Sequence, residues 1–367
     1  MKVPFVRTFD QHEYIMSNIM KRIEDIIRAD SFILGPVVEK FEAKFAQMMG
    51  VKHAVGVASG TDAILLSLRL LDLQPDDQVI FPVFGRVAIP MAVLRVGAAP
   101  IFVDVDPLSG LLDLAKLEGA INQNTRVIIA THLYGKALNM NGLMELARKH
   151  NIAVIEDCAQ AAGGQFHGRS LGAFGISGCF SFNPQSNLGG IGEGGMVITD
   201  VDEYAERLRK FRDHGRLDER YFDEIGYNSH MNAIQAAVLN LKLEELDESN
   251  AERIENARFY NRQFSELNAV LPEAPDNNAH VFNTYTIQVA QRDAMEIYLK
   301  EKKIGCGIYY PVPLHLQPCF DYLGYKEGDF PQAEQLAKRV ISLPVFPGLK
   351  RQEINYVAQT VKEFLNG

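Results

Sequence analysis

The first stretch that could do chemistry is a serine, glycine and threonine turn at residues 59–61, which follows an apolar run and opens a helical pattern. Free backbone N–H groups and the dipole at a helix start favour an anion such as phosphate, and Gly60 would let the backbone approach it closely. A simpler interpretation is that Ser59 or Thr61 only caps the helix. Taken alone, the stretch predicts either an anion site or an ordinary helix start.

A second stretch, VIEDCAQAAGG at residues 154–164, places Asp157 where an apolar run ends. A carboxylate buried at such a position is costly unless it is paired or hydrogen-bonded. One suitable partner is the protonated ring nitrogen of a cofactor, whose pKa the carboxylate would raise. A structural ion pair or a helix cap is the alternative interpretation.

A third stretch, CFSFNPQSNLGGIGEGGMVITD at residues 179–200, predicts two buried strands joined by a polar, glycine-rich loop. Ser181 and Asn183 alternate with phenylalanines, so their side chains should share one face of the first strand. The loop either offers backbone N–H groups to a small anion or is a hairpin without a ligand. Across residues 151–209 the chain contains no lysine, which becomes important below.

The elements that must position these residues alternate between short apolar runs and longer helical patterns. Runs this continuous predict strands buried on both faces, hence a mostly parallel sheet covered by helices. In such sheets ligands bind beyond the carboxyl ends of the strands, so residues there are the candidate site. The predicted strands are HAVGVAS, QVIFP, APIFVDVD, TRVIIATHLYG, IAVIEDCAQ, GCFSF and GMVITD.

A long helical stretch at residues 233–267 has the length of a connector between domains. The patterns after it predict a smaller α+β unit. We therefore expect a large domain at residues 1–248 and a small domain at residues 249–367. The further predicted elements are helices at 12–28, 36–50, 293–303 and 331–341, and strands at 280–289 and 306–313.

Composition limits the partners of this 367-residue chain. Its formal net charge of -9 argues against a general nucleic-acid binder, because phosphate backbones need a basic face. Its four cysteines fit no metal-ligand spacing and are typical of free thiols in a reducing compartment, so we expect no metal site. We see neither a signal peptide nor an apolar run near the roughly 20 residues of a membrane span, and expect a cytoplasmic protein without a membrane partner.

Together these stretches resemble the DegT/DnrJ/EryC1/StrS aminotransferases, pyridoxal-phosphate enzymes that aminate keto-sugars attached to nucleotides. The resemblance implies an α/β architecture of fold type I, with a mostly parallel seven-stranded sheet and a small C-terminal α+β domain. It also implies a homodimer with shared active sites, a nucleotide-linked keto-deoxysugar as substrate and glutamate as the expected amino donor. The motifs that carry it are SGTDA, VIFP, GAAPIFVDVDP, HLYG, VIEDCAQAAGGQFHGRSLGAFG, FSFNP, NLGGIGEGGMVITD, YNSHMNAIQAAVL, YYPVPLHLQP and LPVFPGL.

The resemblance implies a binding place for the cofactor phosphate. Gly60, Thr61 and Ser181 would contact the phosphate within one subunit. Asn228 would reach the phosphate of the partner's cofactor. Asn183 stands at a position that varies in the family and is a further candidate for the phosphate.

The resemblance also implies contacts to the cofactor ring and the substrate. Asp157 would pair with the pyridinium nitrogen, and Gln160 would lie against the ring. The physical interpretation agrees for Asp157, because a protonated pyridine makes the ring an electron sink. The stretch from Tyr309 to His315 would face the nucleotide-sugar.

The match breaks at the position of the family's cofactor-binding lysine. The family pattern Ser-Phe-(His/Tyr/Asn)-Pro-x-Lys-Asn-Leu-Gly reads SFNPQSNLG here, so Ser186 stands in place of lysine. A lysine holds the cofactor covalently and moves a proton between substrate and cofactor. A hydroxyl does neither well, so we expect pyridoxal or pyridoxamine phosphate to be held non-covalently. Ser186 and Asp157 are the predicted catalytic positions.

Two further positions depart from the family. Arg86 lies near a position that is usually aromatic and stacked on the ring. Arginine can stack on a π-system or bind a carboxylate or phosphate, and the alternative is a residue that is at the surface or ion-paired. His230 replaces a usual arginine, so the resemblance carries no α-carboxylate contact from that position.

Three explanations of Ser186 remain open at this point. It is an engineered substitution, a natural divergence with altered chemistry, or the mark of a non-catalytic relative; in one branch of the family, the sugar 3-dehydratases, histidine replaces the lysine. Lys136 is one candidate for a substitute base. The sequence predicts an aminotransferase homologue. A pyridoxamine-phosphate-dependent sugar dehydratase and a non-catalytic relative that binds cofactor or sugar-nucleotide are the alternatives.

Overall fold

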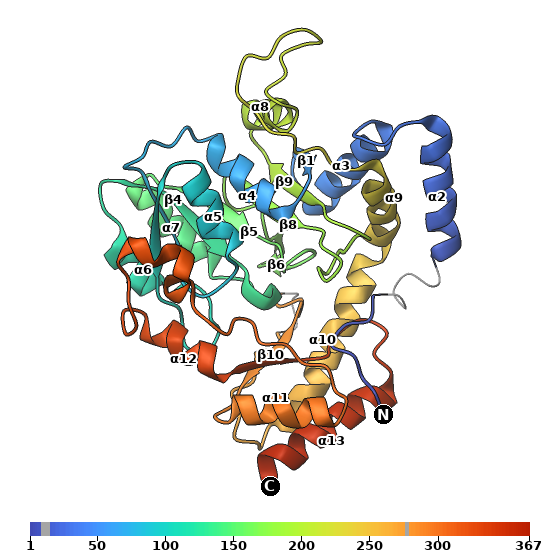
Figure 1. Cartoon of the computed structure of the whole chain (residues 1–367), viewed down its shortest axis with the longest axis vertical. Coiled ribbons are helices and arrows are strands. Elements are labelled where there is room, and N and C mark those ends of the chain that lie inside the picture. Colours follow the sequence, from blue (N-terminus) through green and yellow to red (C-terminus); the bar gives the residue numbers. More distant parts are fainter. Residues whose placement is uncertain (9–14, 276–278) are drawn as a thin grey trace.

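A seven-stranded sheet forms the centre of the protein in the computed structural model, which describes residues 1–8, 15–275 and 279–367 (Figure 1). The strand order is β1-β9-β8-β5-β4-β2-β3. β9 runs antiparallel to both of its neighbours, and the remaining pairs are parallel. The predicted mostly parallel sheet is confirmed, and each predicted run coincides with one strand to within a residue at its start. The strands are β1 (His53–Val57), β2 (Gln78–Pro82), β3 (Ala99–Val103), β4 (Thr125–Thr131), β5 (Ala153–Asp157), β8 (Ser177–Ser181) and β9 (Gly195–Thr199).

The sheet is buried because its strands are apolar on both faces. In β9, Val197 packs into one core, whereas Met196 and Ile198 pack into a second core on the opposite face. In β8, Phe180 lies in that second core, and the neighbouring Ser181 faces the start of α4 instead. The alternation therefore aims the polar residue of β8 away from the phenylalanines, as the sequence predicts.

Helices cover both faces of the sheet (Figure 1). α4 packs against β8, β9 and α5, while α3 packs against β1 and α9. α2 and α3 agree with the predicted helices at 12–28 and 36–50, and residues 12–14 of the first lie outside the described part of the chain. The helices of this region are α2 (Met16–Ala29), α3 (Pro36–Met49), α4 (Gly60–Arg69), α5 (Ala88–Arg95), α6 (Leu114–Ala120), α7 (Met140–His150), α8 (Asp202–Arg212) and α9 (Ala233–Lys242).

The predicted connector is two helices, α9 and α10, separated by a 3-10 turn at Leu243–Glu245. α10 leads into a further core that unites C-terminal elements with Val3 from the N-terminus. The division at residue 248 stays a prediction, because α10 runs across it. The C-terminal elements are α10 (Leu246–Phe264), β10 (Tyr285–Gln288), α11 (Arg292–Glu301), α12 (Pro331–Arg339), β11 (Val340–Leu343) and α13 (Arg351–Asn366).

One prediction for the C-terminal region is wrong, and a second extends a correctly predicted helix two residues too far. Residues 306–313 form no strand, and Gly307 makes only an isolated bridge to Ser342, since the prolines that follow lack the N–H that a ladder needs. The predicted helix at 331–341 ends at Arg339, where the β-branched start of β11 pairs with β10.

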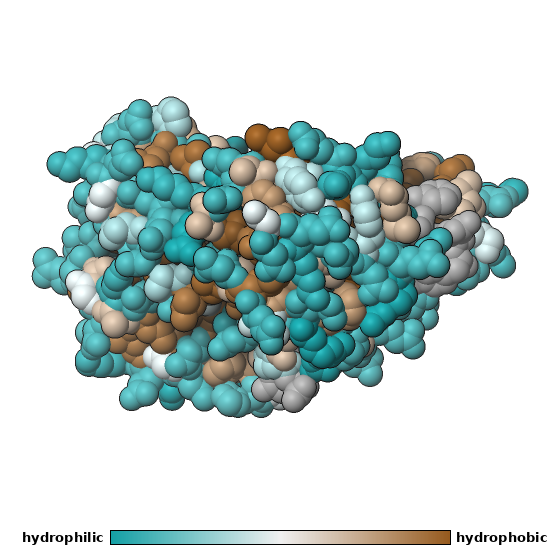
Figure 2. Space-filling model, turned by 90° about the horizontal axis from the view of Figure 1, so that it is seen from below, coloured by the Kyte–Doolittle hydropathy of each residue, from teal (hydrophilic) through white to brown (hydrophobic). Residues whose placement is uncertain are grey.

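The two ends of the molecule differ in surface character. Seen from below, the end that carries α11 and α13 is mostly hydrophilic, with hydrophobic residues in patches between polar ones (Figure 2). At the other end, a hairpin at residues 213–228 projects beyond α8 (Figure 1) and exposes large apolar side chains. No helix in the described part of the chain has the length and apolar character needed to cross a membrane. The exposed side chains of the hairpin are Leu217, Tyr221, Phe222 and Ile225.

Candidate active site

A cleft lies where segments that follow β2, β5 and β8 meet the C-terminal core, at the carboxyl ends of those strands. Phe5 from the N-terminal segment lines it as well. The structure thus brings together residues that are far apart in sequence. Those in the wall that matter below are Arg86, Gln160, Asn183, Ser186, Arg253 and Tyr309.

Asp157 ends β5 close to this cleft and is 2% exposed. Its Oδ1 accepts a hydrogen bond from the backbone N–H of Ala159 at 3.1 Å, whereas Oδ2 has no partner among the described residues. Burial raises the pKa of the Asp157 carboxyl, and the positive charge of Arg86 opposes that rise. A buried oxygen without a donor is costly, so this position suits a donor that a ligand supplies, such as a protonated ring nitrogen.

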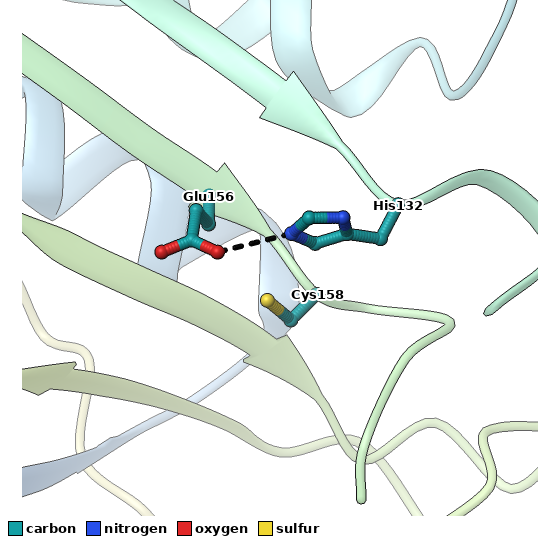
Figure 3. A group of neighbouring side chains, drawn as sticks. All are labelled: His132, Glu156 and Cys158. Carbon is teal, nitrogen blue, oxygen red and sulfur yellow. Dashed lines mark hydrogen bonds and ion pairs between the residues drawn. The ribbon is translucent and has the colours of Figure 1, made fainter. Parts of the chain in front are cut away.

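The residue before it, Glu156, has the opposite environment (Figure 3). His132 Nε2 donates to Glu156 Oε2 at 3.0 Å, and three backbone N–H groups of residues 172–175 donate to the same carboxylate at 2.7–2.9 Å. Cys158 completes a cluster whose potential ligand atoms lie within 4.8 Å of one another. Because every oxygen of Glu156 is already hydrogen-bonded, the cluster holds the chain at 172–175 in place and is not built for a metal ion.

Gly60 and Ser181 meet at the start of α4. Ser59 caps that helix, since its Oγ accepts a hydrogen bond from the N–H of Asp62 at 3.1 Å. The first N–H groups of the helix, at Gly60 and Thr61, remain available to a ligand. A Cβ on Gly60 would lie 2.5 Å from Ser181 Cβ, so a larger residue would collide there. The cap and the anion-site interpretations are therefore compatible.

Ser186 sits on a tight turn after β8. Its N–H donates to the carbonyl of Asn183 at 2.8 Å, and the Asn183 side chain accepts from Gln185 N–H and donates to Glu193. Ser186 is 7% exposed and lines the cleft, and its hydroxyl makes no hydrogen bond to a described residue. The next residue, Asn187, anchors the turn by donating to Asn250 at 2.7 Å.

A hydrogen-bond chain connects Gln160 with Tyr309. Gln160 Oε1 accepts from the N–H of Tyr134 at 2.8 Å, and the Tyr134 hydroxyl donates to the carbonyl of Tyr309. Tyr134 has a left-handed backbone with φ 61, which is uncommon for a bulky residue. The chain links the residues after β5 to the wall contributed by the C-terminal region.

Arg86 follows β2 and lines the cleft in a half-buried position. No carboxylate of the described residues lies within ion-pair distance of it. The alternative of an ion-paired residue is therefore wrong, and Arg86 is only partly exposed at the cleft. Its charge acts on Asp157 and on Tyr310, whose pKa values it lowers against the effect of burial.

A model of the DegT/DnrJ/EryC1/StrS aminotransferase family matches residues 13–362. The chain belongs to this family. It is 42% identical to the UDP-N-acetyl-3-dehydro-alpha-D-glucosamine 3-aminotransferase of Acidithiobacillus ferrooxidans, over 100% of this chain and 98% of that one. It is 41% identical to the pleiotropic regulatory protein of Geobacillus stearothermophilus, over 99% of each.

Solved structures of family members share the fold. DesV from S. venezuelae superposes with a TM-score of 0.97 at 36% identity, covering 100% of this chain and 99% of that one. A family aminotransferase from Brucella abortus gives 0.95 at 33% identity and full coverage of both chains. The predicted α/β fold of the pyridoxal-phosphate-dependent aminotransferases is confirmed.

Three residues that were candidates from the sequence do not line the cleft. His315 is 1% exposed, and its Nε2 lies 3.0 Å from Oε1 of Glu334. It therefore packs inside the protein and does not line the cleft. Lys136 does not line it either, and its amine lies 2.7 Å from a Glu273 carboxylate oxygen. Asn228 is exposed at the base of the hairpin and does not line the cleft.

The sequence did not predict two buried or half-buried cationic side chains, one in the wall of the cleft and one near it. Arg253 of α10 lines it at 3% exposure. Lys242 of α9 donates to the carbonyl of Gly189 at 2.6 Å, and burial, together with the charge of Arg253, lowers its pKa to about 8. Both stand in helical stretches rich in charged residues, so nothing in the local sequence distinguishes them from solvated surface residues.

Proposed function

We propose that this family member binds pyridoxal or pyridoxamine phosphate non-covalently and acts on a nucleotide-linked keto-deoxysugar as an aminotransferase. The observation that carries the proposal is Asp157 Oδ2, a buried carboxylate oxygen without a donor beside a cleft. The family is pyridoxal-phosphate-dependent, and the related NtdA of Bacillus subtilis, 29% identical, was solved with bound PMP. The names of the relatives support a nucleotide-sugar substrate.

The residues of this chain divide the binding of the cofactor. Asp157 would accept a hydrogen bond from the protonated ring nitrogen and so stabilise its charge, and Gln160 would flank the ring. The bound group supplies an electron sink for the bonds broken at the substrate. The start of α4 and Ser181 bind the phosphate through N–H and O–H donors, with Asn183 beside them. Arg86 stacks on the ring or binds an anionic group next to it.

Ser186 leaves the site without the amine that a lysine would supply at this position. Its hydroxyl occupies the position of the family's lysine, and no lysine is among the described residues that line the cleft. The site therefore binds the cofactor without an amine of its own to hold it or to shuttle protons. The same observation favours a second candidate function, that of a relative that binds cofactor or sugar-nucleotide without turnover. A dehydratase, the third alternative, would lack a basic group at position 186.

The cofactor proposal is tested by spectroscopy. The purified chain and its Ser186→Lys and Ser186→Ala variants are loaded with pyridoxal phosphate, treated with borohydride and denatured. We expect a cofactor-labelled peptide only from Ser186→Lys, and reversible binding by the other two proteins. Labelled peptide from the unchanged chain at any other lysine would contradict the proposed role of Ser186.

The reaction is tested with a keto-sugar nucleotide and glutamate. Aminotransfer predicts an aminated sugar and 2-oxoglutarate from the unchanged chain, and a dehydratase predicts loss of water from the sugar. Ser186→Lys should raise turnover by roughly 10²- to 10⁴-fold, the usual contribution of a positioned acid–base group. If only Ser186→Lys turns over while both proteins bind the sugar-nucleotide, the non-catalytic candidate holds.

A homodimer with shared sites is the proposed assembly. It is supported by the hairpin at 213–228, whose Ile225 is 87% exposed, and by Asn228 at its base. Tyr309 in the cleft wall is the proposed contact to the nucleotide-sugar. The four cysteines are free thiols, which supports a cytoplasmic location. Light scattering of the unchanged chain and of Ile225→Asp tests the assembly, and we expect a dimer that the aspartate weakens.

A further inference from the structure

Arg253 is a buried cation that the proposed cofactor binding does not use. It lies on α10 and is 3% exposed, yet it lines the same cleft as Ser186. Its Nη1 donates to the carbonyls of Phe282 and Asn283 at 3.3 and 3.4 Å. Nε has no partner, and Nη2 makes no hydrogen bond to a described residue. The guanidinium of Arg253 therefore has N–H groups, on Nε and Nη2, that lack an acceptor among the described residues.

No carboxylate of the described residues forms an ion pair with Arg253 within 4 Å. The charge of the adjacent Glu252 acts on Arg253 from a longer distance, while the Glu252 carboxylate accepts a hydrogen bond from the N–H of Gly348. Lys242, the other cation that acts on this region, adds positive charge. Burial lowers the pKa of Arg253 to about 10 against the effect of Glu252, so the group remains protonated near neutral pH. A buried cation without an ion-pair partner is costly, which points to a counterion that arrives with a ligand.

The cleft wall has the charge pattern of an anion site. Arg86 and Arg253 line it, and no aspartate or glutamate among the described residues does. The proposed place for the phosphate is the start of α4, where Gly60 and Ser181 meet, and neither of these residues lines the cleft. A guanidinium with two spare donors matches the planar geometry of a carboxylate.

We propose that Arg253 binds a carboxylate in the cleft, and that this carboxylate belongs to the amino-acid donor. The assignment to the donor rests on the proposed function, whereas the carboxylate site itself does not. His230, at the usual arginine position, pairs with Asp213 at 2.8 Å and lies outside the cleft wall of its own subunit. Arg253 thus supplies a cation within the subunit that holds Ser186.

Calorimetric titration with glutarate tests the site, because glutarate has the carboxylates of a donor but no amine to transfer. The full chain is compared with Arg253→Gln and with Arg262→Gln, a matched change at an exposed position of the same helix that does not line the cleft. We expect Arg253→Gln to weaken glutarate binding by roughly 10- to 100-fold, the loss of a charged hydrogen-bonded pair. Arg262→Gln should stay within about threefold. Equal binding by Arg253→Gln, or a loss in Arg262→Gln alone, would overturn the proposal.

A second probe identifies the source of the carboxylate. Glucuronate stands for a sugar that carries a carboxylate, and we expect its binding to be weaker than that of glutarate and indifferent to Arg253→Gln. If Arg253→Gln removes glucuronate binding and leaves glutarate binding intact, the donor assignment is wrong. Both titrations are made without cofactor turnover, so their failure is distinct from a failure of the spectroscopic test of Ser186.

Thermal unfolding separates binding from a structural role. We expect the ligand-free Arg253→Gln protein to melt no lower than the unchanged chain, because the change removes a buried charge that has no ion-pair partner. Arg253→Lys, which keeps the charge and loses the planar fork, should bind glutarate with intermediate affinity. Melting of both variants well below the unchanged chain, together with unaltered glutarate binding by Arg253→Lys, would show that Arg253 only braces the carbonyls of Phe282 and Asn283.

Discussion

Glu156 and Asp157 are consecutive carboxylates at the end of one strand, and both are buried. Glu156 receives four hydrogen bonds, three from backbone N–H groups and one from His132 (Figure 3). Asp157 receives one side-chain hydrogen bond, on Oδ1, and its Oδ2 has no partner among the described residues. Because side chains alternate along a strand, the two carboxylates point to different surroundings.

This difference in hydrogen bonding distinguishes a carboxylate that stabilises the fold from one that has an oxygen free to bind a ligand. A satisfied buried carboxylate stabilises the segments whose N–H groups it accepts, whereas an unsatisfied one costs stability until a donor arrives. Residue type and burial do not tell the two apart. The partner count of each oxygen does, and that count is a property of the tertiary structure.

The largest expected effect is on Glu156. Replacing it in Glu156→Ala leaves three buried N–H groups and His132 without an acceptor, so the free energy of unfolding should fall by about 3–5 kcal/mol. Urea unfolding of the ligand-free protein measures it. Asp157→Ala on the same strand is the control and should cost less than about 1 kcal/mol. Equal losses in the free energy of unfolding would show that Glu156 and Asp157 stabilise the ligand-free fold to the same extent, against our expectation.

The next effect is on cofactor affinity. Asp157→Asn keeps the shape and removes the charge that stabilises a protonated ring nitrogen, so pyridoxamine phosphate should bind roughly 10- to 100-fold more weakly. Fluorescence titration measures the dissociation constant. Unchanged affinity in Asp157→Asn would mean that Oδ2 does not face the ring nitrogen.

A smaller effect is expected at His132. His132→Leu removes one donor to Glu156 and the acceptor for the N–H of Leu138, which His132 Nδ1 receives at 3.2 Å. The backbone donors to Glu156 remain, so the loss should be about 1–2 kcal/mol in urea unfolding. A loss as large as that of Glu156→Ala would show that the histidine, and not the backbone, is the main partner of the carboxylate.

The smallest effect is a pH slope. Burial raises the pKa of Asp157 above the 3.8 of an unperturbed aspartate, so the folded ligand-free protein holds this proton more tightly than the unfolded chain. The stabilisation is present below pH 3.8 and is lost as the pH rises through the raised pKa. Asp157→Asn lacks this loss, and its stability relative to the unchanged chain should therefore increase over that range. Urea unfolding at several pH values measures the difference, and a constant difference would contradict the raised pKa.

The sequence predicted the sheet well because its strands are continuous apolar runs bounded by turn residues. It failed at residues 306–313, where an apolar and aromatic run with prolines forms no strand, and it missed α13. For the site, the motifs led to Asp157, Gln160 and Ser186, which the structure places at or beside one cleft. Arg253 was not predicted, because a single arginine in a charged helix carries no local signal of burial.

The sequence by itself determined the family, the fold and the absence of lysine from the loop at 179–200, since these follow from the order of residues along the chain. Only the tertiary structure decided which carboxylate is satisfied, that His315 pairs with Glu334 inside the protein, and that Arg253 faces the cleft without a counterion. The physical reason is that burial and hydrogen-bond partners come from segments far apart in the sequence. The backbone N–H groups that satisfy Glu156 lie 16 to 19 residues away, and no pattern in the residues between them announces that contact.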